Sequence, residues 1–283
     1  MEIPRSVLQR MPSDLLDIVH KHNRMADVPI HERDPANIET EVIPAGPFEM
    51  KVYFPPIRRE KTVVFVHFPG GKSEKLLHRN IINFNRGAAL AFGVAAVAAL
   101  NGQPVLGIIA VVPVVQTHPN HDKPWGENEC TPGLTPERLL NDLEMAFNGV
   151  EANFRDHWHS DPWKMPDEVL RKLPRIIMVS AKFDILHDSQ VEFRNRIDAL
   201  GMKVEWKAAD GLHQVKDMYQ TQAGREVTEY VTQKTIEMVT RAQSPSLDRQ
   251  DAMVGLTEMF HEFAKVFHQL RAFFIYHSLM HTL

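Results

Sequence analysis

Three consecutive segments late in the chain constrain its fold more than any other feature. Residues 175–181, RIIMVSA, form an apolar run rich in β-branched side chains, and residues 203–210, KVEWKAAD, have the composition of a second strand. Between them, SQVEFRNRIDALG has the pattern of a helix that ends at Gly201. Parallel strands need such a crossover connection, so the order strand, helix, strand predicts two parallel strands in one sheet.

The same alternation extends toward the amino terminus. Residues 62–68, TVVFVHF, form a continuous apolar run that is typical of a strand buried on both faces. An alanine-rich helix is predicted over residues 88–100 and an apolar strand over residues 105–115. Two further helices are predicted, one starting at Thr135-Pro136 and one over residues 225–242. These elements predict an α/β fold with a mostly parallel sheet flanked by helices.

The amino-terminal part has a different pattern. Ser13 precedes a helix-like segment with acidic residues first and basic residues later, which suits the helix dipole. Residues 38–43 and 48–54 alternate apolar and polar side chains on either side of a turn-like PAGP segment, which predicts a hairpin. We therefore expect a helical segment over 1–37, an α/β domain over 38–245 and a carboxy-terminal amphipathic helix over 246–283.

Composition excludes several classes of protein. The chain has 283 residues with 43% hydrophobic side chains, which is sufficient for a large core, and its net charge of -4 argues against a nucleic-acid-binding face. The single cysteine, Cys130, can form neither an internal disulfide nor a multi-cysteine zinc site. The amino terminus lacks the apolar core of a signal peptide, and no apolar run is long enough for a membrane span. We expect a cytoplasmic protein without a cofactor or a metal.

The carboxy-terminal segment carries an apolar stripe at helical spacing. Its members recur at steps of three and four residues: Met253, Leu256, Phe260, Phe263, Phe267, Leu270 and Phe274. Such a stripe must be covered. Packing on the same chain is the first interpretation, a homodimer through residues 249–283 is the second, and a surface membrane anchor is the third.

Two residues that can carry chemistry follow neighbouring strands. Asp184 lies just past the strand at 175–181, and His213 lies just past the strand at 203–210. The carboxyl ends of parallel strands meet at one edge of a sheet, so an aspartate there can orient an imidazole. Each residue also has an alternative interpretation: an aspartate after a strand often caps the next helix, as Asp188 could, and a lone loop histidine is usually solvated.

These segments together resemble a known family. The stretch MVSAKFDILHD, followed by a helix, a strand and GLHQV, is similar to the end of the hormone-sensitive-lipase-like branch of the α/β-hydrolase family. VVFVHFPGG resembles the oxyanion strand and loop of that branch. The resemblance implies an α/β-hydrolase fold, carboxylic esters or biosynthetic intermediates of secondary metabolism as substrates, Asp184 and His213 as acid and base, and Gly70 and Gly71 in the oxyanion loop.

The chain departs from the family at its nucleophile. The alignment of the alanine-rich helix places Asn85 where the family has its serine, and a carboxamide is not a nucleophile. Asn83 replaces the first glycine of the elbow, and Lys72 replaces the last glycine of the oxyanion loop. The segment 72–83 is also much shorter than in the family, which implies that one strand-helix unit is missing.

Two explanations of the short segment stay open: Ile81 and Ile82 anchor a shortened strand, or the sequence derives from a defective gene model. Three functions stay open as well. In the first, the chain is a hydrolase or transferase with another nucleophile, such as Ser73. In the second, it is a serine-less relative that uses His213 as general base for elimination, cyclisation or aldol-type chemistry. In the third, it is a pseudoenzyme that binds a small-molecule ligand or a partner.

The other candidate residues give weaker evidence of a functional site. His157 and His159 have no third ligand at a diagnostic spacing, so we interpret them as surface residues, and the same holds for His118 and His121. Cys130 has no obvious base beside it and is interpreted as inert. Retention of both Asp184 and His213 favours chemistry over pure binding.

Overall fold

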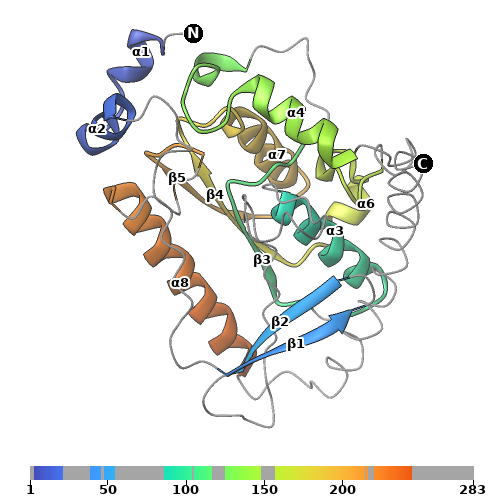
Figure 1. The fold of residues 1–283 in the computed structure, drawn as a ribbon. Helices are drawn as coiled ribbons and strands as arrows, with labels where there is room; N and C mark the ends of the chain where they lie inside the picture. The colour runs from blue at the N-terminus through green and yellow to red at the C-terminus, as the bar shows by residue number, and fades with distance from the viewer. Residues whose placement is uncertain are drawn as a thin grey trace, which may run out of the picture.

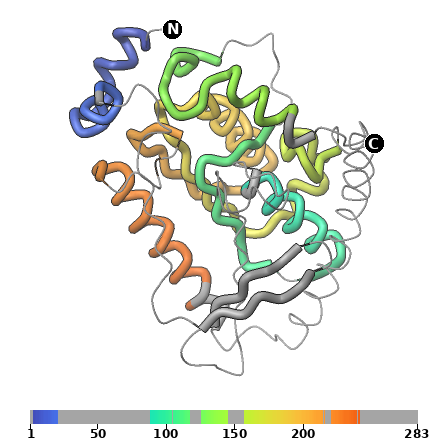
Figure 2. Tube along the Cα trace, viewed as in Figure 1, coloured from blue at the N-terminus to red at the C-terminus, as the bar shows by residue number. Residues whose placement is uncertain are grey.

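The computed structural model describes residues 3–21, 39–45, 48–54, 86–103, 105–116, 125–147, 157–213, 215 and 220–243 (Figure 2). The segments 62–68, 72–83 and 249–283, for which a strand, a shortened connection and an amphipathic helix are expected, lie outside these residues. In the part of the chain that is described, no helix is long and apolar enough to cross a membrane.

A parallel sheet forms the centre of the described fold (Figure 1). It contains β3 (Gly107–Val111), β4 (Arg175–Ala181) and β5 (Val204–Ala209), in the order β3-β4-β5. Both pairs are parallel, as the strand-helix-strand pattern predicts. Ile176, Ile177, Met178 and Val179 of the central strand are almost completely buried, which confirms the buried strand expected at 175–181.

Helices cover both faces of this sheet. On one face, α3 (Arg86–Leu100), α6 (Asp167–Leu170) and α7 (His187–Ala199) pack against β3 and β4 through one apolar cluster. The rings of Phe92 in α3 and Phe193 in α7 meet edge to face, with centroids 5.5 Å apart. On the other face, α8 (Gln222–Gln243) packs Val227 against Val179 and Ala209. This confirms the predicted fold class, an α/β-hydrolase-type sheet flanked by helices.

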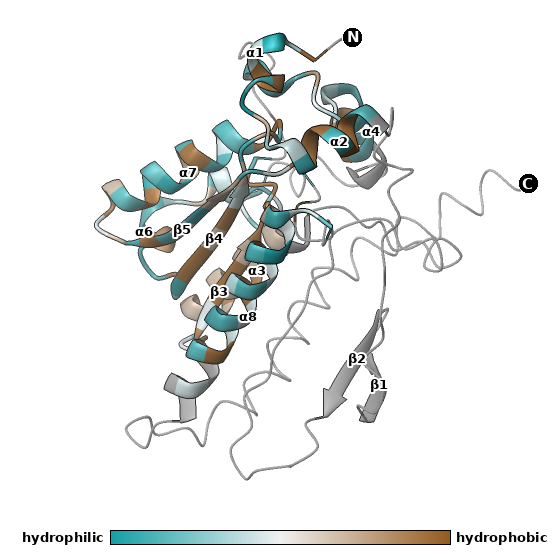
Figure 3. Ribbon diagram, turned by 90° about the vertical axis from the view of Figure 1, so that its left-hand side faces the viewer, coloured by the Kyte–Doolittle hydropathy of each residue, from teal (hydrophilic) through white to brown (hydrophobic). Residues whose placement is uncertain are grey.

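The apolar content of the elements follows these layers. β4 is hydrophobic along most of its length, whereas α7 and α8 also carry hydrophilic residues (Figure 3). Between α8 and β5 an ion-pair network adds to the apolar contacts of Ala209. Glu205 of β5 pairs with Arg175 and, at 3.2 Å, with Lys234 of α8. The Arg175 guanidinium is the main reason that the pKa of Glu205 falls to about 2.

The remaining elements precede the central strands or connect them. They are α1 (Arg5–Leu8), α2 (Ser13–Lys21), β1 (Glu39–Ala45), β2 (Phe48–Phe54), η3 (Gly126–Asn128), α4 (Pro136–Phe147) and η4 (Pro162–Lys164). β1 and β2 form the predicted antiparallel hairpin, in which Ala45 pairs with Phe48. The hydroxyl of Thr135 accepts a hydrogen bond from the backbone N–H of Arg138 at 3.2 Å, so it caps α4 as expected.

Two of the element boundaries that differ from the sequence-based prediction have a clear local cause. The strand expected over 105–115 ends at Val111, because Val112 has a φ of 48° and Pro113 has no N–H for the ladder. β3 also buries only alternate residues. At the amino terminus, α2 begins at Ser13 itself, and the carbonyl of Pro12 accepts the first helical hydrogen bonds, from Leu15 and Leu16.

Candidate functional site

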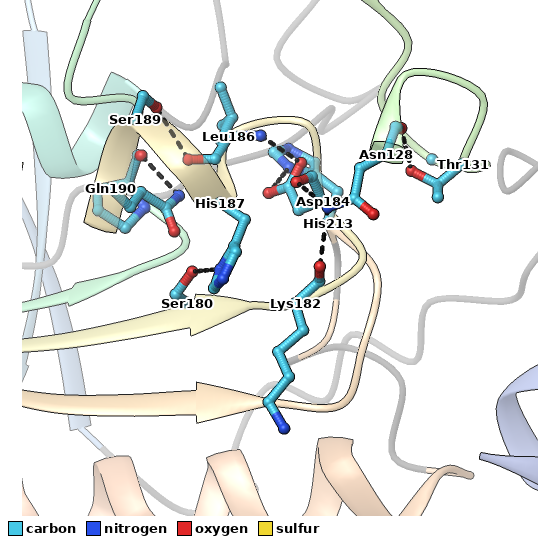
Figure 4. A network of polar contacts seen from close by, with 12 residues as sticks. Asn128, Thr131, Ser180, Lys182, Asp184, Leu186, His187, Ser189, Gln190 and His213 are labelled. Carbon is cyan, nitrogen blue, oxygen red and sulfur yellow. Dashed lines mark hydrogen bonds and ion pairs between the residues drawn. The ribbon is translucent and has the colours of Figure 1, made fainter. Parts of the chain in front are cut away.

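Asp184 and His213 meet at the carboxyl edge of the sheet (Figure 4). The Oδ2 of Asp184 lies 2.8 Å from the Nδ1 of His213. The Asp184 side chain is fully buried, and the His213 side chain is 7% exposed. A buried carboxylate at this distance holds the imidazole in the tautomer with the proton on Nδ1, which leaves the Nε2 lone pair to accept a proton. No hydrogen bond to this Nε2 comes from the described residues.

The two loops that carry the pair are joined by backbone hydrogen bonds beyond the ends of the strands. Ala181 and Ala209 are the last paired residues of β4 and β5. The N–H of Lys182 then donates to the carbonyl of Ala209 at 2.9 Å, and the N–H of Phe183 donates to the carbonyl of Gly211 at 3.1 Å. These bonds continue the ladder into both loops, so the register of the strands sets the distance between the acid and the imidazole.

Asp184 also shapes the turn that leads into α7. Its Oδ1 accepts a hydrogen bond from the N–H of Leu186 at 3.2 Å, and its carbonyl accepts one from the N–H of His187 at 3.0 Å. The Oδ1 bond thus shapes the turn before α7, whereas Oδ2 faces His213; Asp184 is not the cap of α7, because the N-cap position is Leu186, which has no side-chain cap hydrogen bond. Asp188, the alternative cap, instead lies in the first turn of α7.

Asn128, from η3, also contacts the Asp184 turn, and the sequence pattern did not indicate it. Its Nδ2 donates to the carbonyls of Lys182 at 2.8 Å and of Asp184 at 3.1 Å. The only signal in the sequence is a polar residue in the segment GENEC, which looks like an ordinary loop. Proximity to Asp184 could not be read from it.

A second imidazole, that of His187, is paired with a hydroxyl, that of Ser180. The hydroxyl of Ser180 is 2.7 Å from the Nδ1 of His187, the first residue of α7. Burial lowers the pKa of His187, which therefore stays neutral in this site. Ser180 is completely buried at the end of β4, so its hydroxyl has no open path to a substrate. We interpret this pair as a satisfied polar contact between β4 and α7.

Of the histidines interpreted as surface residues, His157 and His159 are partly buried, and His118 and His121 lie outside the described residues. The rings of His157 and His159 stack with centroids 4.2 Å apart, and the ring centroids of Trp158 and His159 are 3.8 Å apart. Burial, followed by the charge of His157, lowers the pKa of His159 to about 4. The surface interpretation is thus corrected to a packed aromatic cluster, and the described residues contain no group of three metal-ligating side chains. Cys130 is a free, partly buried thiol.

Several predicted site residues lie outside the described part of the chain. They are Asn85 at the family's nucleophile position, Gly70 and Gly71 of the expected oxyanion loop, and Ser73, the alternative nucleophile. Their roles stay predictions. Within the described residues, the structure brings Asp184 and His213 together, as their places after neighbouring strands predict.

A protein-family model matches the part of the chain that carries this pair. Residues 85–216, which begin at Asn85 and include both Asp184 and His213, match the family model described as "alpha/beta hydrolase fold". A search of curated protein sequences finds no match.

Solved structures of esterases are similar to the chain. A variant of esterase rPPE bound to (S)-Ac-CPA aligns with a TM-score of 0.57 at 16% identity, over 79% of this chain and 89% of that one. Carboxyl esterase 2 from the mycorrhizal fungus Tuber melanosporum aligns with a TM-score of 0.47 at 18% identity, over 53% of this chain. A thermostable esterase from Pseudomonas putida ECU1011 aligns with a TM-score of 0.47 at 19% identity, over 56% of this chain. The chain spans about half the length of these last two esterases, 50% and 49%. The likeness to the rPPE variant supports the fold.

Proposed function

We propose that this chain, which belongs to the α/β-hydrolase family over residues 85–216, acts on a small ester-like substrate or biosynthetic intermediate with Asp184 and His213 as its acid–base pair. One observation carries the proposal. The Asp184 carboxylate lies 2.8 Å from the His213 imidazole in a buried setting, which is the arrangement that makes an imidazole a general base. A protein that only binds a ligand has no need for this pair.

The chemistry that follows is base-catalysed attack on a carbonyl. His213 Nε2 removes a proton from a water molecule, and the oxygen forms a bond to the ester carbonyl carbon. Asp184 stabilises the imidazolium that results. The tetrahedral intermediate then collapses, the bond to the alcohol oxygen breaks, and His213 returns the proton to the leaving alcohol. The products are a carboxylic acid and an alcohol, and the enzyme is unchanged.

Water takes the role of the nucleophile in this proposal because of Asn85. The family alignment places this residue where a serine would attack, and its carboxamide forms no acyl-enzyme. The choice of an ester-like substrate and of secondary metabolism as the setting rests on the family resemblance of the chain.

Asn85 also favours a second candidate function. With no serine at the aligned position 85, the same His213 base can remove a proton from the substrate itself, which leads to elimination or cyclisation. This reaction uses the same pair, but the proton comes from the substrate: in an elimination a double bond forms as the bond to the leaving group breaks, and His213 returns the proton to that leaving group. A ligand-binding protein without catalysis is the outcome that would contradict both.

A panel of p-nitrophenyl esters of increasing acyl length tests the ester proposal. We expect slow, steady product release without a burst, and a loss of about 100-fold or more in kcat for His213→Gln, since a positioned general base contributes roughly that much. His20→Gln, an exposed residue of α2, is the control and should keep the wild-type rate. Equal rates in His213→Gln and the unmodified protein would overturn the proposal.

A further inference from the structure

The geometry points to Asn128 as a positioning residue for the Asp184–His213 pair, an inference that rests on the proposed function. The Asn128 amide nitrogen donates to both the Lys182 and the Asp184 carbonyl, which flank Phe183 in the turn after β4. One side chain thereby fixes both ends of the segment from which the Asp184 carboxylate projects (Figure 4). Asn128 is 8% exposed, so little solvent competes for these bonds.

Asn128 is itself held in place from its own side. Its carbonyl accepts hydrogen bonds from the Thr131 hydroxyl at 2.8 Å and from the Thr131 N–H at 3.0 Å. Thr131 is 1% exposed. These two hydrogen bonds fix the Asn128 backbone in a turn, and its side chain extends from this turn to the carbonyls of Lys182 and Asp184.

The rest of the segment 125–134 packs on the same turn. Gly126 has a φ of 69°, which favours glycine, and a Cβ there would lie 2.7 Å from the Oδ2 of Asp188, so that carboxylate would have to shift. Trp125 and Leu134 pack in one apolar cluster with residues 185 and 186. Apolar packing places segment 125–134 against the turn, and the Asn128 amide then sets the orientation of the peptide planes.

The hydrogen bonds of the Asn128 side chain are made by its amide nitrogen and not by its amide oxygen. Its Oδ1 is buried and has no hydrogen-bond partner in the described part of the chain, whereas its Nδ2 has two. A buried acceptor without a partner is unfavourable. The amide is therefore placed for its donors, and these donors act on the two carbonyls beside the catalytic carboxylate.

Loss of these donors should loosen the carboxylate rather than unfold the protein. The Lys182 and Asp184 carbonyls would turn toward other donors, and the Asp184 Oδ2 would no longer be held at 2.8 Å from His213 Nδ1. Small misplacements of catalytic groups have large effects on rate, so we expect kcat on a turned-over ester to fall roughly 10- to 100-fold with little change in KM.

Gln190 provides a matched control. It is also a completely buried amide, it donates from Nε2 to the Pro113 carbonyl at 2.9 Å, and its Oε1 also lacks a partner among the described residues. It lies in α7, away from the 182–184 turn. A change at Gln190 thus removes the same kind of buried hydrogen bond without touching the turn that carries Asp184.

The experiment is nitrogen-15 NMR of the His213 imidazole in the full chain, which needs no substrate. The unmodified protein should show one neutral tautomer, with the proton on Nδ1. Asn128→Asp, which has the same shape but no donors when ionised, should show a mixture of tautomers and faster exchange of that proton. Gln190→Met should keep the wild-type signal, even if its melting temperature falls equally.

A single Nδ1–H tautomer in Asn128→Asp would overturn the inference, and so would an equal mixture in Gln190→Met. If the Asn128 variant does not fold, Thr131→Val replaces it, since this change removes only the 2.8 Å bond to the Asn128 carbonyl; an unaltered His213 signal there would overturn the inference as well. An unmodified protein with one tautomer but no ester turnover would contradict the proposed function alone.

Discussion

The carboxylate of Asp184 and the imidazole of His213 are 29 residues apart in the chain and 2.8 Å apart in the structure. The parallel pairing of β4 and β5 accounts for this proximity, because both residues follow the last paired positions of their strands. The loops continue the strand ladder through two further backbone hydrogen bonds. The pair thus lies at the edge of the sheet, where the strand register brings the two loops side by side.

Replacement of Asp184 by asparagine should change the tautomer of His213. An amide can donate to Nδ1, whereas the carboxylate only accepts from it, so the proton should move to Nε2 and the base would lose its lone pair on the side of the substrate. Nitrogen-15 NMR measures the two tautomers directly. Asp188→Asn, in the first turn of α7, is the control. The same tautomer in Asp184→Asn and the unmodified protein would mean that the two side chains do not interact in solution.

A fluorophosphonate probe should not label the unmodified protein. Such probes react with an activated serine, and the aligned position holds Asn85. Asn85→Ser should not restore normal activity, because Asn83 and Lys72 still stand where the family has glycines that let the backbone approach the substrate. Mass spectrometry of the probe-treated protein checks this. Stoichiometric labelling at a serine, with Ser73 as the first to test, would contradict the prediction and show that the protein has a nucleophilic serine, as ordinary esterases do.

Gly211→Ala should destabilise the loop that carries His213. The added Cβ would lie 2.2 Å from the Cγ2 of Val215, closer than any real contact. We expect a loss of roughly 1 to 3 kcal/mol, the usual effect of overpacking, measured by urea unfolding. Val215→Ala in the same chain should recover part of the loss, since it removes the closest atom. Gly102→Ala, whose Cβ meets nothing within 4 Å, tests the effect of a positive φ alone.

His159 should make the stability of the fold sensitive to acid. Its pKa in the folded state is lowered to about 4, so between about pH 6.5 and pH 4 the unfolded chain binds a proton there that the folded chain does not. Stability should therefore fall as the pH decreases through this range. Because solvent screens this half-buried ring, its contribution to the loss of unfolding free energy is about 1 to 2 kcal/mol.

The measurement is urea unfolding at pH 7 and pH 4.5. His159→Gln cannot bind this proton and should lose less stability between the two pH values than the unmodified protein does. The exposed His20 serves as the control, because His20→Gln should keep the full pH dependence. Equal pH dependence in His159→Gln and the unmodified protein would show that the ring is not buried in solution.

The carboxy-terminal stripe should be structural. Deletion of the chain after Pro245 removes its phenylalanines, each of which is worth on the order of 2 to 3 kcal/mol when buried. We expect the truncated protein to aggregate, because the surface that the stripe covers, on this chain or on a second copy, becomes exposed. Light scattering and thermal melting measure this. A truncated protein that is monomeric, soluble and equally stable would remove both interpretations.

Much of the described fold was predictable from local patterns. The apolar run at 175–181, the helix that ends near Gly201 and the strand from Val204 follow from side-chain periodicity and from a glycine with a φ of 81°. The order of these elements required parallel pairing, and parallel pairing brought Asp184 and His213 to one edge. The length of β3 was not predictable from hydrophobicity, because Pro113 and the backbone at Val112 end the ladder within an apolar run.

The sequence by itself therefore determined the elements, their order and the edge of the sheet where the acid and the imidazole lie. Only the tertiary structure decided which distant residues meet there. The Asn128 side chain contacts the carbonyl of Asp184, 56 residues away in the chain. The ring of His159 is half-buried by packing that the residues beside it in the sequence do not indicate. The physical reason is that periodicity reports which face of one element is apolar, whereas a contact between loops depends on how several packed elements are placed together.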